Sequence, residues 1–274
     1  MMVKKFSLRG SGLCRRVSEG QRALDAYRTQ TPNPLDMTPT TKRLLPVAAL
    51  PIAILVLLAQ GCASARNSGP TVSQQGASRA SAGLPASFYA ALERGVVDEL
   101  NRARTDPSGY ARSLEQDLQY YRGNLFRRPE DESALQTREG PDALREAIGV
   151  LRSTRPMSPL RTSAGMNLGA RDHVNDQAPR GLMNHRGTDG TMAWDRVSRY
   201  GEWQRKVSEN MTFGPSSARD VVAGLLIDDG IRDRSHRKNV LDADIKLVGV
   251  ACGAHKTYRI MCDIVHAVGF AEKK

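Results

Sequence analysis

The chain has 274 residues, a net charge of +11 and a composition that is 40% hydrophobic but only 5% aromatic. Residues 1–61 hold nine Lys or Arg and three Asp or Glu, so this segment carries +6 of the net charge. Only the later part of the chain has the composition of a globular domain. A nucleic-acid-binding protein needs a concentrated basic stripe or aromatic platforms, so these numbers argue against that class. We expect one globular domain after residue 85 and no nucleic-acid partner.

The N-terminal part of the chain has the features of an export signal. An apolar run over residues 44–59 follows the basic pair 42–43 and contains two prolines. It is too short and too broken to span a membrane as a helix, but it suits the apolar region of a signal peptide. We predict a signal peptide over residues 37–61, with translation starting at Met37 and residues 1–36 forming a non-native upstream extension.

The signal ends at Ala59-Gln60-Gly61-Cys62. Small residues before a cysteine resemble the lipobox of bacterial lipoproteins, so we predict that Cys62 is lipidated; the alternative is a plain cleavage site with an incidental cysteine. Each buried CH₂ of an acyl chain contributes about 0.8 kcal/mol, so several chains would hold the protein on a membrane. The remainder of segment 62–87 is rich in Ser, Ala and Gly and predicts a flexible tether. We therefore expect an exported protein, either attached to the cell envelope or secreted.

Amphipathic patterns predict helices through most of the domain, which we place at residues 88–272. Ser87 would cap the first helix, and Asp106-Pro107 is typical of a helix start, with aspartate as N-cap and proline at the first helical position. The expected helices are 87–105, 106–121, one from Pro141 that is closed by Pro156 and Pro159, 163–177, 192–200, and one that begins at Ser216 or Ser217. The charged residues 122–139 are expected to form a loop.

The character of the chain changes near its end. Residues 246–252 and 258–268 are β-branched and apolar enough for two strands around a turn. Helices followed by strands predict an α+β layered domain. If the hairpin centres near Thr257, Cys252 and Cys262 face each other, and a disulfide there would contribute about 2–3 kcal/mol. The alternative is two buried thiols.

No short motif of a nucleotide-binding, serine-hydrolase or zinc-protease site is present. The remaining candidates are dispersed histidines and acids whose side chains could ligate zinc or another divalent cation, or transfer protons. They are His185, Glu209, Asp228, Asp229 and His236. Each also has a structural explanation, such as hydrogen bonding within a loop, satisfying backbone amides, or ending and capping helices. His173, His255 and His266 are expected to be structural.

Taken together, these residues resemble the CAP superfamily, also called the SCP domain, which includes cysteine-rich secretory, antigen five and plant pathogenesis-related proteins. The resemblance rests on residues 184–190 (Asn-His-x-Gly-x-Asp-Gly), 208–210 (Ser-Glu-Asn) and 235–241 (Ser-His-Arg-x-Asn-Val-Leu), followed by Val-Gly-Val-Ala-Cys at 248–252. It covers residues 88–272, and the stretches around His236 and Cys262 look like a bacterial branch of the group.

The resemblance implies a three-layer α-β-α sandwich with a cleft where two histidines and two acids converge, in some members around a divalent metal. His185 and His236 match the two histidines, and Glu209 matches the acid of the Gly-Glu-Asn motif. Asp228 or Asp229 would supply the second acid. Ser208 and Ser235 stand where the family motifs have glycine.

The family resemblance carries no settled chemistry, and no nucleophile with an adjacent base is visible in the sequence. We therefore expect a non-enzymatic binding module whose cleft engages an envelope ligand or protein, with or without a cation such as zinc. The alternatives are a metal-assisted hydrolase of peptides or other exported polymers, with Glu209 as its base, and a lipid or sterol carrier.

Overall fold

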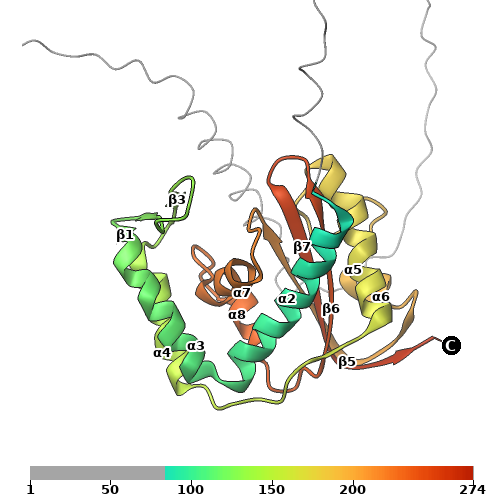
Figure 1. Cartoon of the computed structure of the whole chain (residues 1–274). Helices are drawn as coiled ribbons and strands as arrows, with labels where there is room; N and C mark the ends of the chain where they lie inside the picture. The colour runs from blue at the N-terminus through green and yellow to red at the C-terminus, as the bar shows by residue number, and fades with distance from the viewer. Residues whose placement is uncertain (1–83, 274) are drawn as a thin grey trace, which may run out of the picture. The chain divides into compact units, whose positions relative to one another are not determined.

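The computed structural model describes residues 84–273 (Figure 1). The predicted upstream extension, signal peptide and Cys62 lie outside these residues, as does nearly all of the predicted tether. None of the helices in the described range is both long and apolar enough to span a membrane.

The domain is built on a four-stranded sheet with the strand order β4-β6-β7-β5. Its strands are β4 (Arg161–Thr162), β5 (Gly201–Phe213), β6 (Leu247–His255) and β7 (Arg259–Glu272). The predicted hairpin is confirmed as β6 and β7, which pair antiparallel, while β4 runs parallel to β6. Cys252 lies directly opposite Cys262, and the two are joined in a disulfide.

The edge strand β5 is absent from the sequence prediction. It pairs antiparallel with β7 along its whole length, with a register shift between Gln204 and Val207. Its first half, Glu202 to Lys206, is exposed. An edge strand with one half in solvent needs no continuous apolar run, so its sequence lacks the pattern that identifies β6 and β7.

Helices α5 (Ala164–Gln177) and α6 (Ala193–Val197) cover one face of this sheet, as Figure 1 shows. The helix α5 approaches β6 so closely that a Cβ added to Gly249 would lie 2.3 Å from a backbone atom of Met166. Glycine at this position therefore lets the helix and the sheet pack directly against each other.

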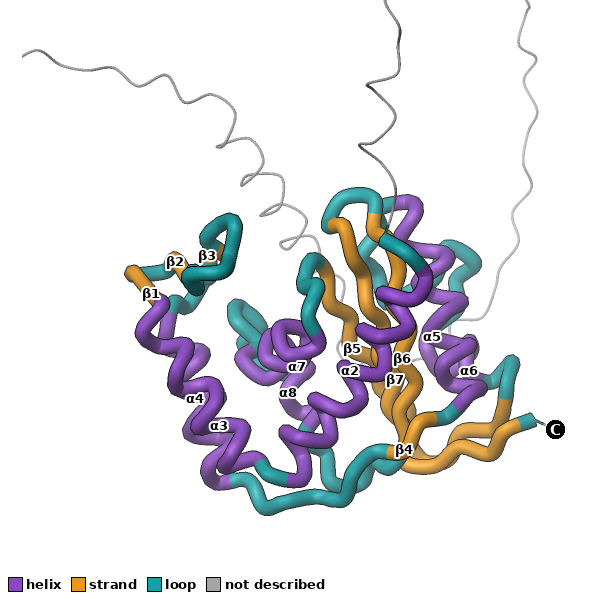
Figure 2. The backbone as a smooth tube through the Cα atoms, viewed as in Figure 1, coloured by secondary structure: helices purple, strands orange, loops and turns teal. Residues whose placement is uncertain are grey.

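The other face carries α2 (Ala86–Thr105), α7 (Ala218–Ile227) and α8 (Ser235–Val240), while α3 (Pro107–Glu115) and α4 (Pro141–Ser153) pack together beyond them (Figure 2). Alternate residues of β6 and β7, including Val248, Val250 and Ile264, join the helices in the main hydrophobic core. The helices and the sheet thus form an α-β-α sandwich, which confirms the predicted α+β class.

Local capping explains several helix starts that the sequence predicts. The side chain of Asp106 accepts a hydrogen bond from Gly109 N, and Ser163 and Ser217 cap α5 and α7 in the same way. The prediction is wrong at α2, because Pro85 takes the N-cap position and Ser87 lies inside the first turn. It is also too long at α6, which ends at Val197.

The segment predicted as a loop, residues 122–139, contains short strands. β1 (Tyr121–Arg122), β2 (Leu125–Phe126) and β3 (Leu135–Gln136) form a small antiparallel sheet after the 3₁₀ turn Gln116–Tyr120. Arg128 bonds to both Asp117 and Asp220, and this ties the small sheet to α7.

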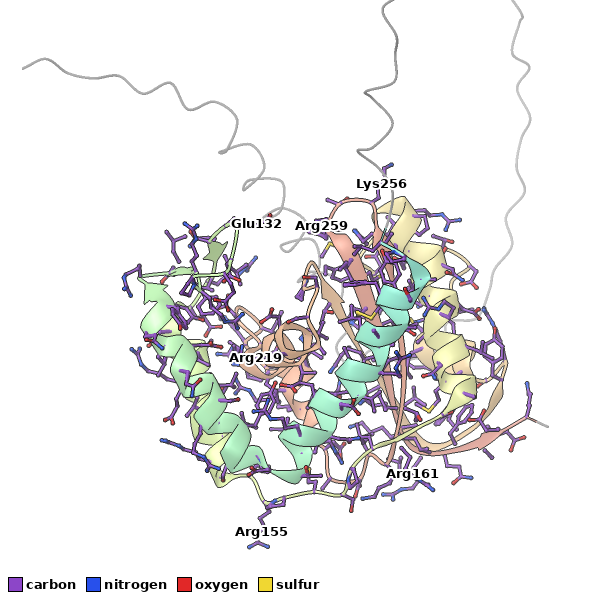
Figure 3. All side chains as sticks on the ribbon, in the orientation of Figure 1. Glu132, Arg155, Arg161, Arg219, Lys256 and Arg259 are labelled. Atoms are coloured by element: carbon purple, nitrogen blue, oxygen red, sulfur yellow. A yellow bond between two sulfur atoms is a disulfide. The ribbon has the colours of Figure 1, made fainter. Side chains whose placement is uncertain are left out.

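Charged side chains are distributed over the surface of the domain (Figure 3). Arg155 and Arg161 lie at one end of the view, while Lys256 and Arg259 lie at the opposite end. Arg219, near the centre, reaches from α7 to Asp117 at 2.9 Å.

Candidate functional site

The first part of the site is a fixed imidazole beside a buried carboxylate. His185 Nδ1 lies 2.7 Å from Glu209 Oε2, while the guanidinium of Arg196 bonds to Glu209 Oε1. The same guanidinium donates to the carbonyl oxygens of His185 and Thr191. Arg196 therefore holds both the acid on β5 and the loop that carries the histidine.

A cavity of about 220 Å³ opens beside this pair. Its lining combines apolar with polar side chains. The lining residues are His185, Met192, Ala193, Trp194, Val207, Ser208, Glu209 and Asn239. Because successive strand residues face opposite sides, Glu209 meets the α6 side of the sheet, and Ser208 meets the α8 side. The cavity therefore lies at the edge of the sheet formed by β5 and is lined by residues from both faces of that strand.

A second acid lies near Glu209 on the neighbouring strand, opposite Met211. Asp263 on β7 is completely buried, and burial together with the nearby charge of Glu209 raises the pKa of its carboxyl well above the usual value. Burial alone would also raise the pKa of Glu209, but the hydrogen bond from His185 and the charge of Arg196 lower it. The arrangement therefore favours a protonated Asp263 near an ionised Glu209.

The second predicted histidine forms its own pair. Asp228 ends α7 in a left-handed conformation, with φ of 56°, and its Oδ1 lies 2.7 Å from His236 Nδ1. Its Oδ2 accepts the backbone N–H of His236 at 3.0 Å. Of the two adjacent aspartates, Asp228 is thus the one that orients His236.

Asp229 has a different role, because its two oxygens accept the backbone N–H groups of Arg138 and Glu139 at 2.7 and 2.9 Å. The five predicted metal ligands therefore fall into two histidine–acid pairs and one acid that anchors a loop. Within residues 84–273, no group of three or more His, Cys, Asp or Glu side chains is arranged to hold a metal ion. Metal binding stays a prediction.

The two serines that replace glycine in the motifs fit their positions. Neither Ser208 nor Ser235 has a left-handed backbone conformation. A side chain at these positions therefore causes no backbone strain.

The remaining histidines are packed into the domain. His173 and His266 are fully buried, and burial is the main cause that lowers the pKa of His173 to about 4 and that of His266 to about 3. The ring of His255 accepts backbone N–H groups of the β6–β7 turn.

Sequence reasoning missed Arg196, Asp263 and Trp194, and it gave no role to Asn239, which lies within the quoted motif at 235–241. Arg196 and Asp263 carry no local motif, since their roles depend on contacts between α6, β5 and β7. Trp194 is one of only two tryptophans in the chain, and this rarity was the one signal for it in the sequence.

The model of the cysteine-rich secretory protein family, CAP, matches residues 120–264. The chain belongs to the CAP family. The match spans Glu209, His236 and the first part of β7, so the site described above lies within the family's own domain. No curated protein matches the chain.

Two solved structures are similar to this CAP chain. An outer surface protein from Borrelia burgdorferi is 14% identical over 43% of this chain and 80% of its own, with a TM-score of 0.35. An extracellular protein containing an SCP domain from Bacillus anthracis is 18% identical over 40% of this chain, with a TM-score of 0.33. The matched region spans 34% of that second protein.

Proposed function

We propose that this CAP protein is an exported binding module of the cell envelope that holds a small ligand, or a side chain of a larger one, in the cavity beside His185 and Glu209. The observation that carries the proposal is the cavity itself, in which fixed polar groups stand against an apolar wall. Such a combination is typical of binding sites, because apolar walls supply affinity and a few polar groups supply orientation.

The state of Glu209 supports binding over catalysis. Both of its oxygens have partners, His185 and Arg196, and its side chain is only 4% exposed, so a substrate has little access to the lone pairs that remain. A general base must have a lone pair within reach of the proton that it removes. Glu209 is thus better suited to orient His185 than to accept a proton from a substrate.

The test of this binding role is a fragment screen on the ¹⁵N-labelled protein, with the indole N–H signals of its tryptophans as reporters. Trp194 lines the cavity, whereas Trp203 lies on the exposed half of β5 and serves as an internal control. The proposal expects that at least one class of fragment shifts the Trp194 signal alone. If saturating amounts of neutral, anionic and cationic fragments all leave Trp194 unchanged, the cavity is not a binding site.

The export and anchoring part of the proposal rests on the signal-like segment 37–61 and on Cys62. Phase partition of the expressed protein in detergent tests it. The wild type should enter the detergent phase, and Cys62→Ser should remain in the aqueous phase. Aqueous partition of both proteins would contradict lipidation.

Binding of a divalent cation by His185 and His236 is a part of the proposal that can be tested separately from ligand binding. Elemental analysis of protein dialysed against zinc should find one zinc per chain in the wild type, and less in the His185→Ala, His236→Ala double variant. Equal zinc content in the two proteins would exclude a cation bound by these histidines.

The His185–Glu209 pair also supports a second candidate, a hydrolase. An imidazole oriented by a carboxylate at 2.7 Å can transfer protons during catalysis. Peptide cleavage by the wild type that is lost in Glu209→Gln would favour this candidate, and no turnover of peptide mixtures by the wild type would reject it.

A further inference from the structure

The two edges of the four-stranded sheet differ in how their backbone groups are satisfied. At the β6 edge, Asn167 Oδ1 accepts the N–H of Val250 at 2.8 Å. Beside it, the N–H of Cys252 donates to Glu93 at 2.7 Å, and the carbonyl of Cys252 accepts from Arg171. Side chains of α2 and α5 therefore satisfy this edge beyond the short strand β4.

At the β5 edge, a short stretch of backbone lacks such partners. Gly214 N donates to the carbonyl of Ile260 beside β7, and the direction of the backbone groups alternates along an antiparallel strand. In this register, Ser208 faces β7, and the N–H and C=O groups of Val207 and Glu209 face away from the sheet. No hydrogen bond within residues 84–273 uses these outward groups.

The outward backbone groups are accessible from the cavity. The side chain of Glu209 is only 4% exposed, but the residue as a whole is half-buried, so most of its accessible surface belongs to its backbone. Val207 and Glu209 both line the cavity. A ligand in the cavity can therefore reach backbone donors and acceptors two residues apart on one strand.

Two helices are tied to this stretch of β5, one on each face. Arg196 of α6 bonds to Glu209, and Asn239 of α8 donates to Asn210 Oδ1 at 2.8 Å. Asn210 Nδ2 in turn donates to the carbonyl of His236 at 3.2 Å. The surroundings of the edge are thus fixed before a ligand binds, and such preorganisation lowers the entropic cost of binding.

The neighbouring residues disfavour pairing between two copies of the chain. β5 has a bulge between Gln204 and Val207, where the exposed Arg205 and Lys206 lie. Bulges and charged side chains are features by which edge strands avoid pairing with each other. β5 of a second copy would also be flanked by its own α6 and α8, whereas an extended peptide has no flanking helices. A peptide therefore fits this edge better than a second copy does.

We propose that the β5 edge at Val207 and Glu209 binds an extended peptide segment of a partner protein, which joins the four-stranded sheet as a fifth strand. In antiparallel addition, the peptide residues opposite Val207 and Glu209 exchange backbone hydrogen bonds with them. Directly opposite side chains lie on the same face, so those of the peptide point to the α6 side, toward Met192 and Trp194. Apolar, β-branched side chains suit these positions. The inference rests on the proposed function and specifies the chemical class of its ligand.

The test is an NMR titration of the ¹⁵N-labelled full chain with the blocked peptide acetyl-Ser-Val-Thr-Val-Ser-amide. Its two valines alternate with polar residues, so both can face α6 at once. We expect the peptide to shift the Trp194 indole signal but not that of Trp203. It should also slow the hydrogen exchange of the Val207 and Glu209 amides, because they gain acceptors.

N-methylation of the peptide distinguishes strand pairing from simple occupation of the cavity. Methyl groups on the two valine nitrogens remove the N–H groups that would face β5, so we expect binding to be at least about tenfold weaker. Methyl groups on the threonine and last serine nitrogens alter N–H groups that face away from β5. This matched control peptide should keep its affinity within about threefold.

Val207→Pro tests the same contact from the side of the protein. It removes an outward N–H but no hydrogen bond to β7, and proline is tolerated at an edge strand where the N–H faces solvent. We expect the variant to bind the peptide at least about tenfold more weakly. Trp203→Phe, on the exposed half of β5, assigns the two indole signals and should leave the affinity unchanged. A urea unfolding curve for each variant identifies any loss of folding.

The outcomes separate this inference from the proposed function. If the peptide does not shift Trp194 while another fragment does, or if the two methylated peptides bind alike, strand pairing is wrong while the binding role stands. The same conclusion follows if folded Val207→Pro binds the peptide as the wild type does. If neither the peptide nor any fragment shifts Trp194, both are wrong.

Discussion

His266 provides the sharpest test of the physical reasoning, because it is a fully buried imidazole whose ring nitrogens have no hydrogen-bond partner in the described domain. Burial, with the charges of Arg104 and Lys206, lowers its pKa from 6.5 to about 3. The unfolded chain therefore binds a proton at higher pH than the folded chain does. Stability is fully present above pH 6.5 and is lost as the pH falls toward 3.

The expected magnitude follows from this shift. Each pH unit between the two pKa values costs about 1.4 kcal/mol, so the folded state should lose about 2 kcal/mol between pH 7 and pH 5 through His266 alone. The change His266→Leu, which has a similar volume, removes the titrating group. It also removes two unsatisfied nitrogens, so we expect the variant to be more stable than the wild type by about 1–3 kcal/mol at pH 7.

Urea unfolding of both proteins at pH 7 and pH 5 measures the effect. The advantage of His266→Leu should grow by about 2 kcal/mol at the lower pH. Met261→Leu, a change at another fully buried position of β7, should give a difference that does not depend on pH. An advantage of His266→Leu that is the same at both pH values would refute the reasoning.

Three further changes test the packing and the charges of the sheet. Gly249→Ala places a Cβ 2.3 Å from the backbone of Met166, so it should destabilise the domain by about 1–3 kcal/mol in urea unfolding; a neutral effect would contradict the close packing of α5. Replacing Cys252 and Cys262 by serine should cost about 2–3 kcal/mol, and reducing agent should then have no further effect on the melting temperature. Asp263→Asn should be more stable than the wild type at pH 7, because the raised pKa of Asp263 makes the folded state lose stability as the pH rises above 3.8; the difference should vanish in unfolding curves below that pH.

The sequence by itself determined the elements whose patterns are local. The caps at Asp106 and Ser163 are formed by side chains within a few residues of the amides they bind, and periodicity identified the helices between them. At α7 the sequence left Ser216 and Ser217 open, and the structure has Ser217 as the cap. The two apolar strands and the position of their turn placed Cys252 opposite Cys262, because register in a hairpin is fixed by its turn. Motif resemblance identified the family and the residues His185, Glu209 and His236.

The tertiary structure alone decided how those residues are used. The polar strand β5 is held by its pairing with β7, so its own sequence does not reveal it. The pairing of Glu209 with Arg196, of Asp228 with His236, and of Asn210 with Asn239 joins separate elements, and residue spacing does not specify such contacts. The burial of Asp263 and His266 likewise depends on helices packed over both faces of the sheet, since only the removal of water makes an unpaired acid or imidazole costly to ionise.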